Sequence, residues 1–172
     1  DRLDAQLLLG HRLQRDRAWL IAHDDTLLPD ATAEAFAVDC RRRASGEPLA
    51  YLVGEREFHG LRLQVTPDVL VPRPDTEALL EWALDALPPP GDDVPRLLDL
   101  GTGSGAIALA IAHERPRATV TGTDVSAAAV QVARRNALQL RLGNVEFVVG
   151  DWFEPVADRR YDLVVSNPPY IA

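Results

Sequence analysis

Apolar and polar positions alternate with a helical period in the first part of this chain. Leu3 and Leu7 share one face of a helix at this period, and a second short helix is expected after Asp16. A third helix is predicted over 32–44, where Gly46 follows the last turn, as glycine commonly does. The pattern therefore predicts a helical amino-terminal part.

The period changes in the segment 49–71. Residues 61–65 alternate between apolar and polar side chains, which is typical of a β-strand. Residues 69–71 are predicted to pair with this strand, so that the segment forms a hairpin. A helix is expected over 76–87, and the proline-rich stretch 88–93 is interpreted as a surface connection.

From Arg96 onward, predicted strands and helices alternate strictly. The pattern predicts strands at 97–100, 119–123, 145–149 and 161–165, with helices at 106–114 and 127–140. Alternation at this spacing indicates right-handed βαβ units and a parallel sheet. The predicted fold class is therefore α/β, with a helical domain before the sheet.

Composition fits an ordinary globular protein. The chain has 172 residues, of which 47% are hydrophobic and 26% charged. No apolar run approaches the ~20 residues of a membrane-spanning helix, and no stretch resembles a signal peptide. The single cysteine, Cys40, cannot form an internal disulfide, so we expect a reducing, cytoplasmic setting and no membrane partner.

The net charge of −8 also limits the possible partners. Every basic residue other than histidine is Arg. The acidic balance argues against binding to the phosphate backbone of a nucleic acid, because such binding needs a basic face. The four histidines are scattered and lack the spacing of metal ligands, so no metal is predicted.

A glycine-rich turn lies between the first strand of the alternating part and its first helix. It consists of Gly101, Thr102, Gly103, Ser104 and Gly105. Glycines at this place let a ligand approach the backbone and the helix N-terminus. The turn satisfies the dinucleotide fingerprint if the residue after Gly105 replaces the third glycine. It predicts a nucleotide-type site but does not separate NAD from other adenosine ligands.

Two further candidates follow the next strands. Asp124 stands where a dinucleotide site places the acid that binds the ribose hydroxyls, although it or Ser126 could instead cap the following helix. Asp151 and Trp152 follow the next strand, and the pair suits an adenine amine and ring. An alternative is that Trp152 is simply a core residue.

The last candidate is Asn167-Pro168-Pro169-Tyr170, directly after the final strand. Two consecutive prolines cannot continue a strand ladder, so the strand is expected to end at Asn167 and the backbone after it to be conformationally restricted. The corner presents an amide, two carbonyls and a ring, which suit a planar –NH2 group. An ordinary proline turn is the alternative.

Because it has both the glycine-rich turn and Asn-Pro-Pro-Tyr, the chain resembles class I S-adenosylmethionine-dependent methyltransferases. In that superfamily an acidic-x-Gly-x-Gly-x-Gly turn, matched from Asp99 to Gly105, holds the methionine part of the cofactor. Asn-Pro-Pro-Tyr marks the members that methylate a planar nitrogen of a nucleic-acid base or of a glutamine. The resemblance implies a Rossmann-like sheet.

A third stretch narrows the resemblance. Residues 46–54 (GEPLAYLVG), then Glu57-Phe58, then 69–77 (VLVPRPDTE) are similar to the peptide chain release factor glutamine methyltransferases, the PrmC/HemK family. The resemblance implies a helical domain over 1–48 that docks the release factor, a hairpin linker over 49–75 and a cofactor-binding domain over 76–172. Family members continue with further strands, so we expect a fragment whose sheet lacks its carboxyl-terminal strands.

The resemblance also assigns roles to residues. The glycine turn, Asp124, Trp152 and Asn167 would contact S-adenosylmethionine, which leaves as S-adenosylhomocysteine. Asn167, Pro168, Pro169 and Tyr170 would hold the glutamine of a Gly-Gly-Gln motif, with Asn167, Pro168 and Tyr170 as the catalytic set and Arg73 at the pocket mouth. The partner would be a class I release factor, and the enzyme a monomer.

Three other functions stay open from the residues. A nucleic-acid amino methyltransferase could use the same corner on a flipped base. An NAD-dependent oxidoreductase is allowed by the glycine turn but leaves Asn-Pro-Pro-Tyr unexplained. A non-catalytic docking protein is a third possibility.

Overall fold

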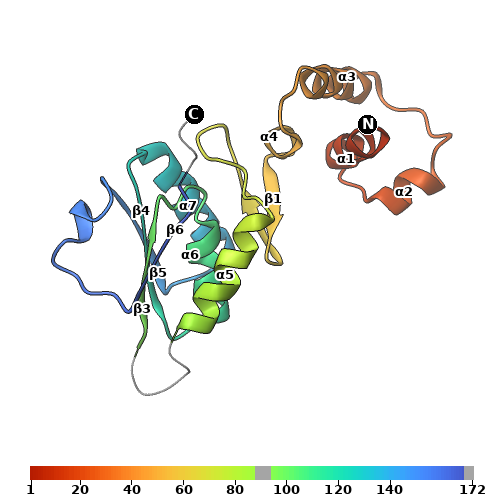
Figure 1. The fold of residues 1–172 in the computed structure, drawn as a ribbon. Coiled ribbons are helices and arrows are strands. Elements are labelled where there is room, and N and C mark those ends of the chain that lie inside the picture. Colours follow the sequence, from red (N-terminus) through yellow and green to blue (C-terminus); the bar gives the residue numbers. More distant parts are fainter. Residues whose placement is uncertain (88–93, 169–172) are drawn as a thin grey trace. The chain divides into compact units, whose positions relative to one another are not determined.

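The computed structural model describes residues 1–87 and 94–168. The chain folds into two compact units, Asp1–Gly54 and Glu55–Ala172 (unit 1 and unit 2; Figure 1). Pro169 and Tyr170, which the sequence assigns to the substrate corner, lie outside the described residues. In the described part of the chain, no helix is long and apolar enough to cross a membrane.

Unit 1 is helical, as predicted. It contains α1 (Arg2–Leu13), α2 (Arg17–Ala22), α3 (Asp30–Ala44) and α4 (Leu49–Val53). Asp16 caps α2, because its carboxylate accepts a hydrogen bond of 2.7 Å from the backbone N–H of Trp19. The short α4 was not predicted, since its five residues are too few to establish a helical period.

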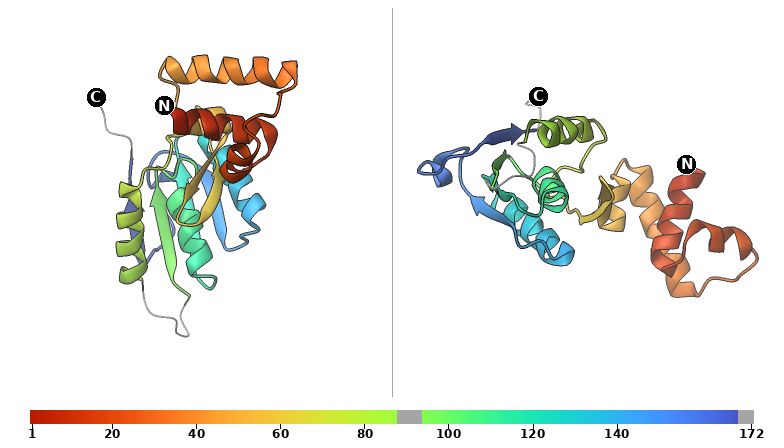
Figure 2. Two further views of the ribbon diagram at one scale, coloured as in Figure 1. Left: turned by 90° about the vertical axis from the view of Figure 1, so that its right-hand side faces the viewer. Right: turned by 90° about the horizontal axis from the view of Figure 1, so that it is seen from below.

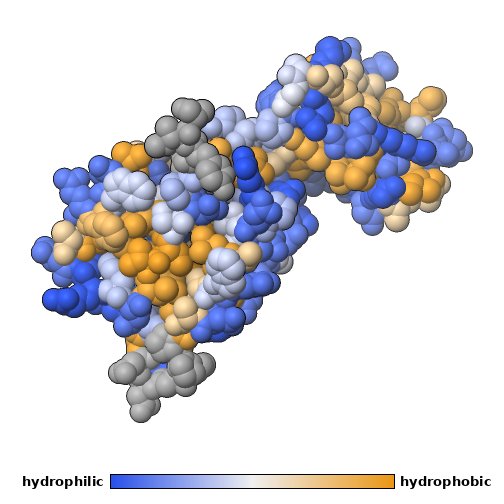
Figure 3. Space-filling view, in the orientation of Figure 1, coloured by the Kyte–Doolittle hydropathy of each residue, from blue (hydrophilic) through white to orange (hydrophobic). Residues whose placement is uncertain are grey.

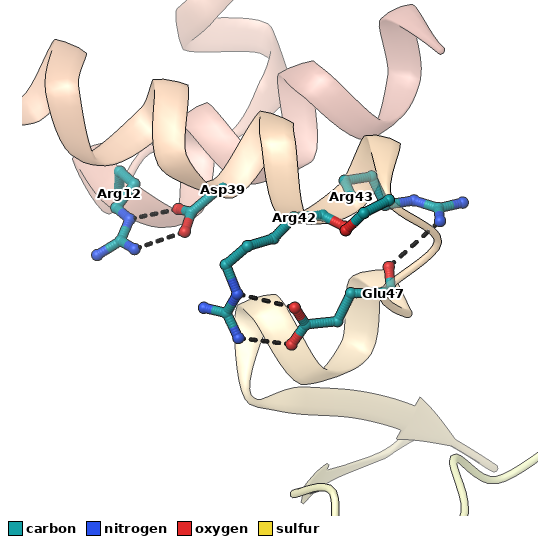
Figure 4. A network of polar contacts seen from close by, with 6 residues as sticks. Arg12, Asp39, Arg42, Arg43 and Glu47 are labelled. Atoms are coloured by element: carbon teal, nitrogen blue, oxygen red, sulfur yellow. Dashed lines mark hydrogen bonds and ion pairs between the residues drawn. The ribbon is translucent and has the colours of Figure 1, made fainter.

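Helices α1 and α3 are joined by a partly buried ion pair (Figure 4). Arg12 donates two hydrogen bonds, of 2.6 and 2.8 Å, to the carboxylate of Asp39, which is only 1% exposed. The hydrogen bond from Arg12 lowers the pKa of Asp39. Near the end of α3, Arg43 pairs with Asp4 of α1 at 2.7 Å, so α1 and α3 are tied at two points.

Unit 2 begins with an antiparallel hairpin of β1 (Glu55–Phe58) and β2 (Leu61–Gln64). The predicted pairing of residues 69–71 with 61–65 is therefore wrong. The turn at His59-Gly60 has positive φ at both residues, 48° and 73°, as a two-residue hairpin turn requires. The period-2 alternation itself is confirmed, because Leu61 and Leu63 are buried while Arg62 and Gln64 are exposed.

The main sheet has four parallel strands in the order β5-β4-β3-β6. They are β3 (Arg96–Leu100), β4 (Thr119–Asp124), β5 (Val145–Val149) and β6 (Leu163–Ser166). The parallel α/β sheet predicted from the alternation is confirmed. Strand order reverses at β3, because the chain moves outward to β5 and then returns to pair β6 on the other side of β3.

Three helices cover one face of this sheet (Figure 2, right). They are α5 (Asp75–Ala86), α6 (Ala106–Glu114) and α7 (Ala127–Leu140), while the short η1 (Glu154–Val156) lies on the other side. Every residue from 106 to 112 in α6 is buried, so this helix is the centre of the core. Figure 3 shows apolar side chains gathered on the viewer's side of unit 2, over the region where Figure 1 draws β3 and β6.

Candidate functional site

A cavity of about 670 Å³ opens at the carboxyl ends of the strands, and all of its lining residues belong to unit 2. It lies beside the strand-order reversal between β3 and β6, where Leu100 pairs with Ser166. Open α/β sheets bind their ligands at this kind of switch point. Its volume lies in the usual range of small-molecule sites.

The cavity brings together most of the site residues predicted from the sequence. Its wall includes Gly101, Thr102, Gly103, Ser104, Asp124, Trp152, Asn167, Pro168 and Arg73. Gly105 is the exception: it does not line the cavity but caps α6 beneath it, with φ of 84°. A Cβ at Gly105 would lie 2.9 Å from Leu109 and 3.0 Å from Phe147, so packing as well as backbone conformation requires glycine there.

The glycine turn is held by backbone hydrogen bonds to β4. The N–H groups of Gly101 and Thr102 both donate to the carbonyl of Thr123 at 2.9 Å. The Gly103 N–H donates to Oδ2 of Asp124 at 2.9 Å, and among the described residues none but its chain neighbours comes within 4 Å of where its Cβ would be. The turn therefore offers an open backbone surface to a ligand in the cavity.

Asp99 lies under this turn and is 1% exposed. Burial raises its pKa to about 6, and the neighbouring charge of Asp124 acts in the same direction. Hydrogen bonds from the Thr102 hydroxyl, at 2.7 Å, and from the backbone of Ala108 oppose the rise. The carboxylate thus receives an N–H from the first turn of α6, where the helix dipole favours a negative charge.

Asp124 ends β4 with both carboxylate oxygens engaged. Oδ2 accepts from Gly103 and Oδ1 accepts from the N–H of Ser126, each at 2.9 Å. Ser126 itself caps α7 through the N–H of Ala129. Each oxygen of Asp124 keeps a second lone pair for a ligand hydroxyl, so the capping interpretation and the ribose interpretation are compatible.

Trp152 is 52% exposed and lines the cavity, so the core interpretation of this residue is wrong. Its φ of 43° is unusual for a bulky residue, and its carbonyl accepts from the Thr123 hydroxyl at 3.2 Å. This turn places the indole beside the cavity rather than in the sheet's core.

Asn167 stands at the end of β6 and donates from Nδ2 to Oγ1 of Thr76 at 2.8 Å. The preceding Ser166 hydroxyl donates to the carbonyl of Leu100 at 3.0 Å, which fixes the end of β6 against β3. Pro168 faces Gly101, since a Cβ at Gly101 would lie 3.9 Å from Pro168. No local sequence pattern indicated this bond between Thr76 and Asn167.

One wall of the cavity was not predicted from the sequence. Residues 68–72, of which 69–71 were predicted to form a hairpin strand, instead run along the cavity as irregular chain. The available signal was Pro67 and Pro72, since proline removes a ladder donor and argues against a paired strand.

The charge of the wall narrows the class of ligand. Among the lining residues there are five carboxylates and one guanidinium, namely Asp68, Asp75, Asp99, Asp124, Asp151 and Arg73. Such a wall favours a ligand that carries positive charge over the anionic pyrophosphate of a dinucleotide. Within the described residues no group of His, Cys, Asp and Glu is arranged to hold a metal ion.

The family model described as "Methyltransferase small domain" matches residues 76–172, more than half of the chain. The chain belongs to the methyltransferase small-domain family. Residues 1–54 match a second model, the PrmC N-terminal domain, and so coincide with unit 1.

Curated relatives of this methyltransferase-family chain carry the name release factor glutamine methyltransferase. The protein from Bordetella pertussis is 54% identical over 99% of this chain and 63% of its own length. That from Escherichia coli is 45% identical over 99% of this chain and 60% of its own length. The resemblance to that group is therefore confirmed, and the chain spans about three fifths of these relatives.

Solved structures agree on the fold. Human methyltransferase 10 domain containing protein matches with a TM-score of 0.57 and 19% identity, over 85% of this chain and 65% of that one. The Pyrococcus abyssi tRNA (uracil-54, C5)-methyltransferase, in complex with S-adenosyl-L-homocysteine, matches with a TM-score of 0.54 and 20% identity, over 67% and 28%. At this identity the likeness shows the fold, a Rossmann-like methyltransferase sheet.

Proposed function

We propose that the full-length protein methylates the side-chain amide nitrogen of the glutamine in the Gly-Gly-Gln motif of class I release factors, using S-adenosylmethionine. The observation that carries the proposal is the placement of Asn167 and the glycine turn in one acidic cavity at the switch point. The names of the relatives point to the same substrate. We further propose a cytoplasmic monomer, with neither nucleic acid nor membrane as partner.

The cavity suits this cofactor. S-adenosylmethionine bears a sulfonium and an ammonium, which the carboxylates of the wall favour, and when bound it supplies an electrophilic methyl group and leaves as S-adenosylhomocysteine. Asp124 would accept from the ribose hydroxyls and Trp152 would lie beside the adenine. The open backbone of Gly101, Gly103 and their neighbours would pass along the methionine part.

The chain's contribution to the reaction is to hold the glutamine amide. An amide nitrogen is a poor nucleophile because its lone pair is delocalised into the carbonyl. Acceptance of its two N–H groups, by Oδ1 of Asn167 and the carbonyl of Pro168, favours a less planar nitrogen and counters its developing positive charge. Asn167 is not basic, so the proton leaves to water. Pro169 and Tyr170 would cover the amide, with Arg73 at the mouth.

The domain roles follow the same proposal. The amino-terminal helices, 1–48, would dock the release factor, and residues 49–75 would link them to the cofactor domain, 76–172. The nucleic-acid alternative is not favoured by the relatives' names. That alternative predicts that the protein is retained on DNA or RNA at moderate salt.

The test is radiolabelled methyl transfer to purified release factor by the full-length protein and its Asn167→Ala variant. Loss of a positioned acceptor is expected to lower kcat by about a hundredfold. Gln139→Ala, on the exposed side of α7, is the matched control and should retain the wild-type rate. Undiminished transfer by Asn167→Ala would exclude the acceptor role, and calorimetry with NAD in place of S-adenosylmethionine would detect an oxidoreductase.

A further inference from the structure

The hydrogen bond between Asn167 and Thr76 joins residues 91 positions apart in the chain. We propose that Thr76 is a positioning residue: its hydroxyl accepts a hydrogen bond from Nδ2 of Asn167 and so holds this side chain in place, with Oδ1 left for the substrate amide. This inference rests on the proposed function. The segment 72–77 (PRPDTE), which contains Thr76, would then contribute to methyl transfer and not only form the mouth of the pocket.

Thr76 occupies the first position of the buried stripe of α5. Thr76, Leu80 and Ala83 are 8%, 0% and 3% exposed and lie at i, i+4 and i+7, on one face of the helix. An apolar residue such as valine would continue this stripe equally well. The hydroxyl is therefore not needed for packing, and its partner at 2.8 Å is Asn167.

The amino end of α5 fixes the hydroxyl in place. The N–H of Thr76 donates to the carbonyl of Arg73 at 3.0 Å, and Pro72 and Pro74 restrict the chain just before it. A β-branched side chain in a helix has few χ1 rotamers. Thr76 is thus a rigid partner, whereas Asn167 follows the end of a strand.

The orientation of the Asn167 amide matters because its two ends have nearly the same shape but opposite chemistry. The –NH2 end only donates and the oxygen only accepts. With Nδ2 engaged by Thr76, Oδ1 is left for a ligand, and within residues 1–87 and 94–168 it accepts no hydrogen bond. If the amide flipped, it would direct a donor at the N–H groups of the glutamine, and the acceptor would be lost.

The test compares three variants of the full-length protein with the wild type. Thr76→Val removes the hydroxyl but keeps the shape, Thr76→Ser keeps the hydroxyl, and Thr121→Val removes another buried hydroxyl outside the cavity wall. We expect Thr76→Val to lower kcat about tenfold, while KM for release factor and Kd for S-adenosylmethionine change less than about twofold. Thr76→Ser should restore most of kcat, and Thr121→Val should match the wild type.

A double-mutant cycle separates positioning from a general structural effect. If Thr76 acts through Asn167, Thr76→Val should cost nothing further in an Asn167→Ala background. Additive losses, or a wild-type kcat in Thr76→Val, would overturn the inference. A wild-type protein that transfers no methyl to release factor would instead contradict the proposed function.

The bond can also be tested without turnover. The Asn167 side-chain NH2 signals, assigned by their loss in Asn167→Ala, should shift in Thr76→Val and stay in place in Thr121→Val. Unshifted signals in Thr76→Val would overturn the inference independently of any activity.

Discussion

At the scale of single residues, burial decides the chemistry of Asp99. The sequence marks it as the acidic residue before the glycine turn, but only the structure shows it 1% exposed beneath that turn. Its pKa is raised to about 6, because the loss of hydration outweighs the hydrogen bonds from Thr102 and Ala108. At neutral pH the carboxylate is therefore mostly ionised, and it costs folding free energy.

This predicts a specific pH dependence of stability. Between the ordinary pKa of about 4 and the folded value of about 6, the folded protein keeps a proton that the unfolded chain has released. The stabilisation is full below pH ~4 and is lost as the pH rises through about 6. Relative to Asp99→Asn, the wild type should lose about 3 kcal/mol of unfolding free energy between pH ~4 and pH ~7, measured by urea titration. Parallel curves for the two proteins would contradict the buried ionisation.

At the scale of elements, α7 carries a polar tether that no periodicity indicates. Asn136, fully buried, exchanges two hydrogen bonds with the backbone of Gln64 in β2, at 2.7 and 3.0 Å. Its Nδ2 also donates to the carbonyl of Ser104 at 2.9 Å. One side chain thus joins the hairpin, α7 and the glycine turn.

Loss of this tether should destabilise the protein. Asn136→Ala leaves the N–H and carbonyl of Gln64 and the carbonyl of Ser104 without their side-chain partner, at an expected cost of about 3 kcal/mol. The matched control is Gln139→Ala, whose exposed side chain bonds that of Gln64 at 3.0 Å and whose loss should cost less than about 0.5 kcal/mol. Urea denaturation measures both, and equal costs for the two variants would show that Asn136 is no tether.

Most elements could be predicted from local pattern, and the failures share a cause. Helices 106–114 and 127–140 and strand 145–149 have the predicted bounds, because each carries several repeats of its period or is bounded by clear turn residues. The short β1 and α4 carry too little pattern. The apolar run at 69–71 favoured a strand there, but the prolines on either side of it, Pro67 and Pro72, deny it a hydrogen-bonded ladder.

At the scale of the whole molecule, the proposed roles fall to different units, with docking of the release factor on unit 1 and cofactor binding on unit 2. The cavity is built from unit 2 alone, and unit 1 matches the PrmC N-terminal domain. Unit 1 depends on the Arg12–Asp39 pair, in which Asp39 is buried and Arg12 is partly exposed. Loss of this ion pair should therefore weaken docking of the release factor and leave the affinity for the cofactor unchanged.

We expect Arg12→Ala to leave an unpaired buried carboxylate and to destabilise unit 1 by about 2 kcal/mol. Hydrogen exchange in α1 and α3 should accelerate and methylation of release factor should fall, while calorimetric Kd for S-adenosylmethionine stays within about twofold. Arg41→Ala, an exposed position on α3, is the control for lost charge. A matching loss of cofactor affinity in Arg12→Ala would contradict this division.

By itself, the sequence determined the order of α-helices and β-strands from Arg96 onward, the parallel sheet, and the chemical groups collected at the carboxyl ends of its strands. Those features follow from hydrophobic period and turn chemistry, which act over a few neighbouring residues. Only the tertiary structure decided that residues 68–72 form a cavity wall, that Asp99 is buried, and that Thr76 holds Asn167. These depend on contacts between distant parts of the chain, such as the 91-residue separation of Thr76 and Asn167, which local patterns do not encode.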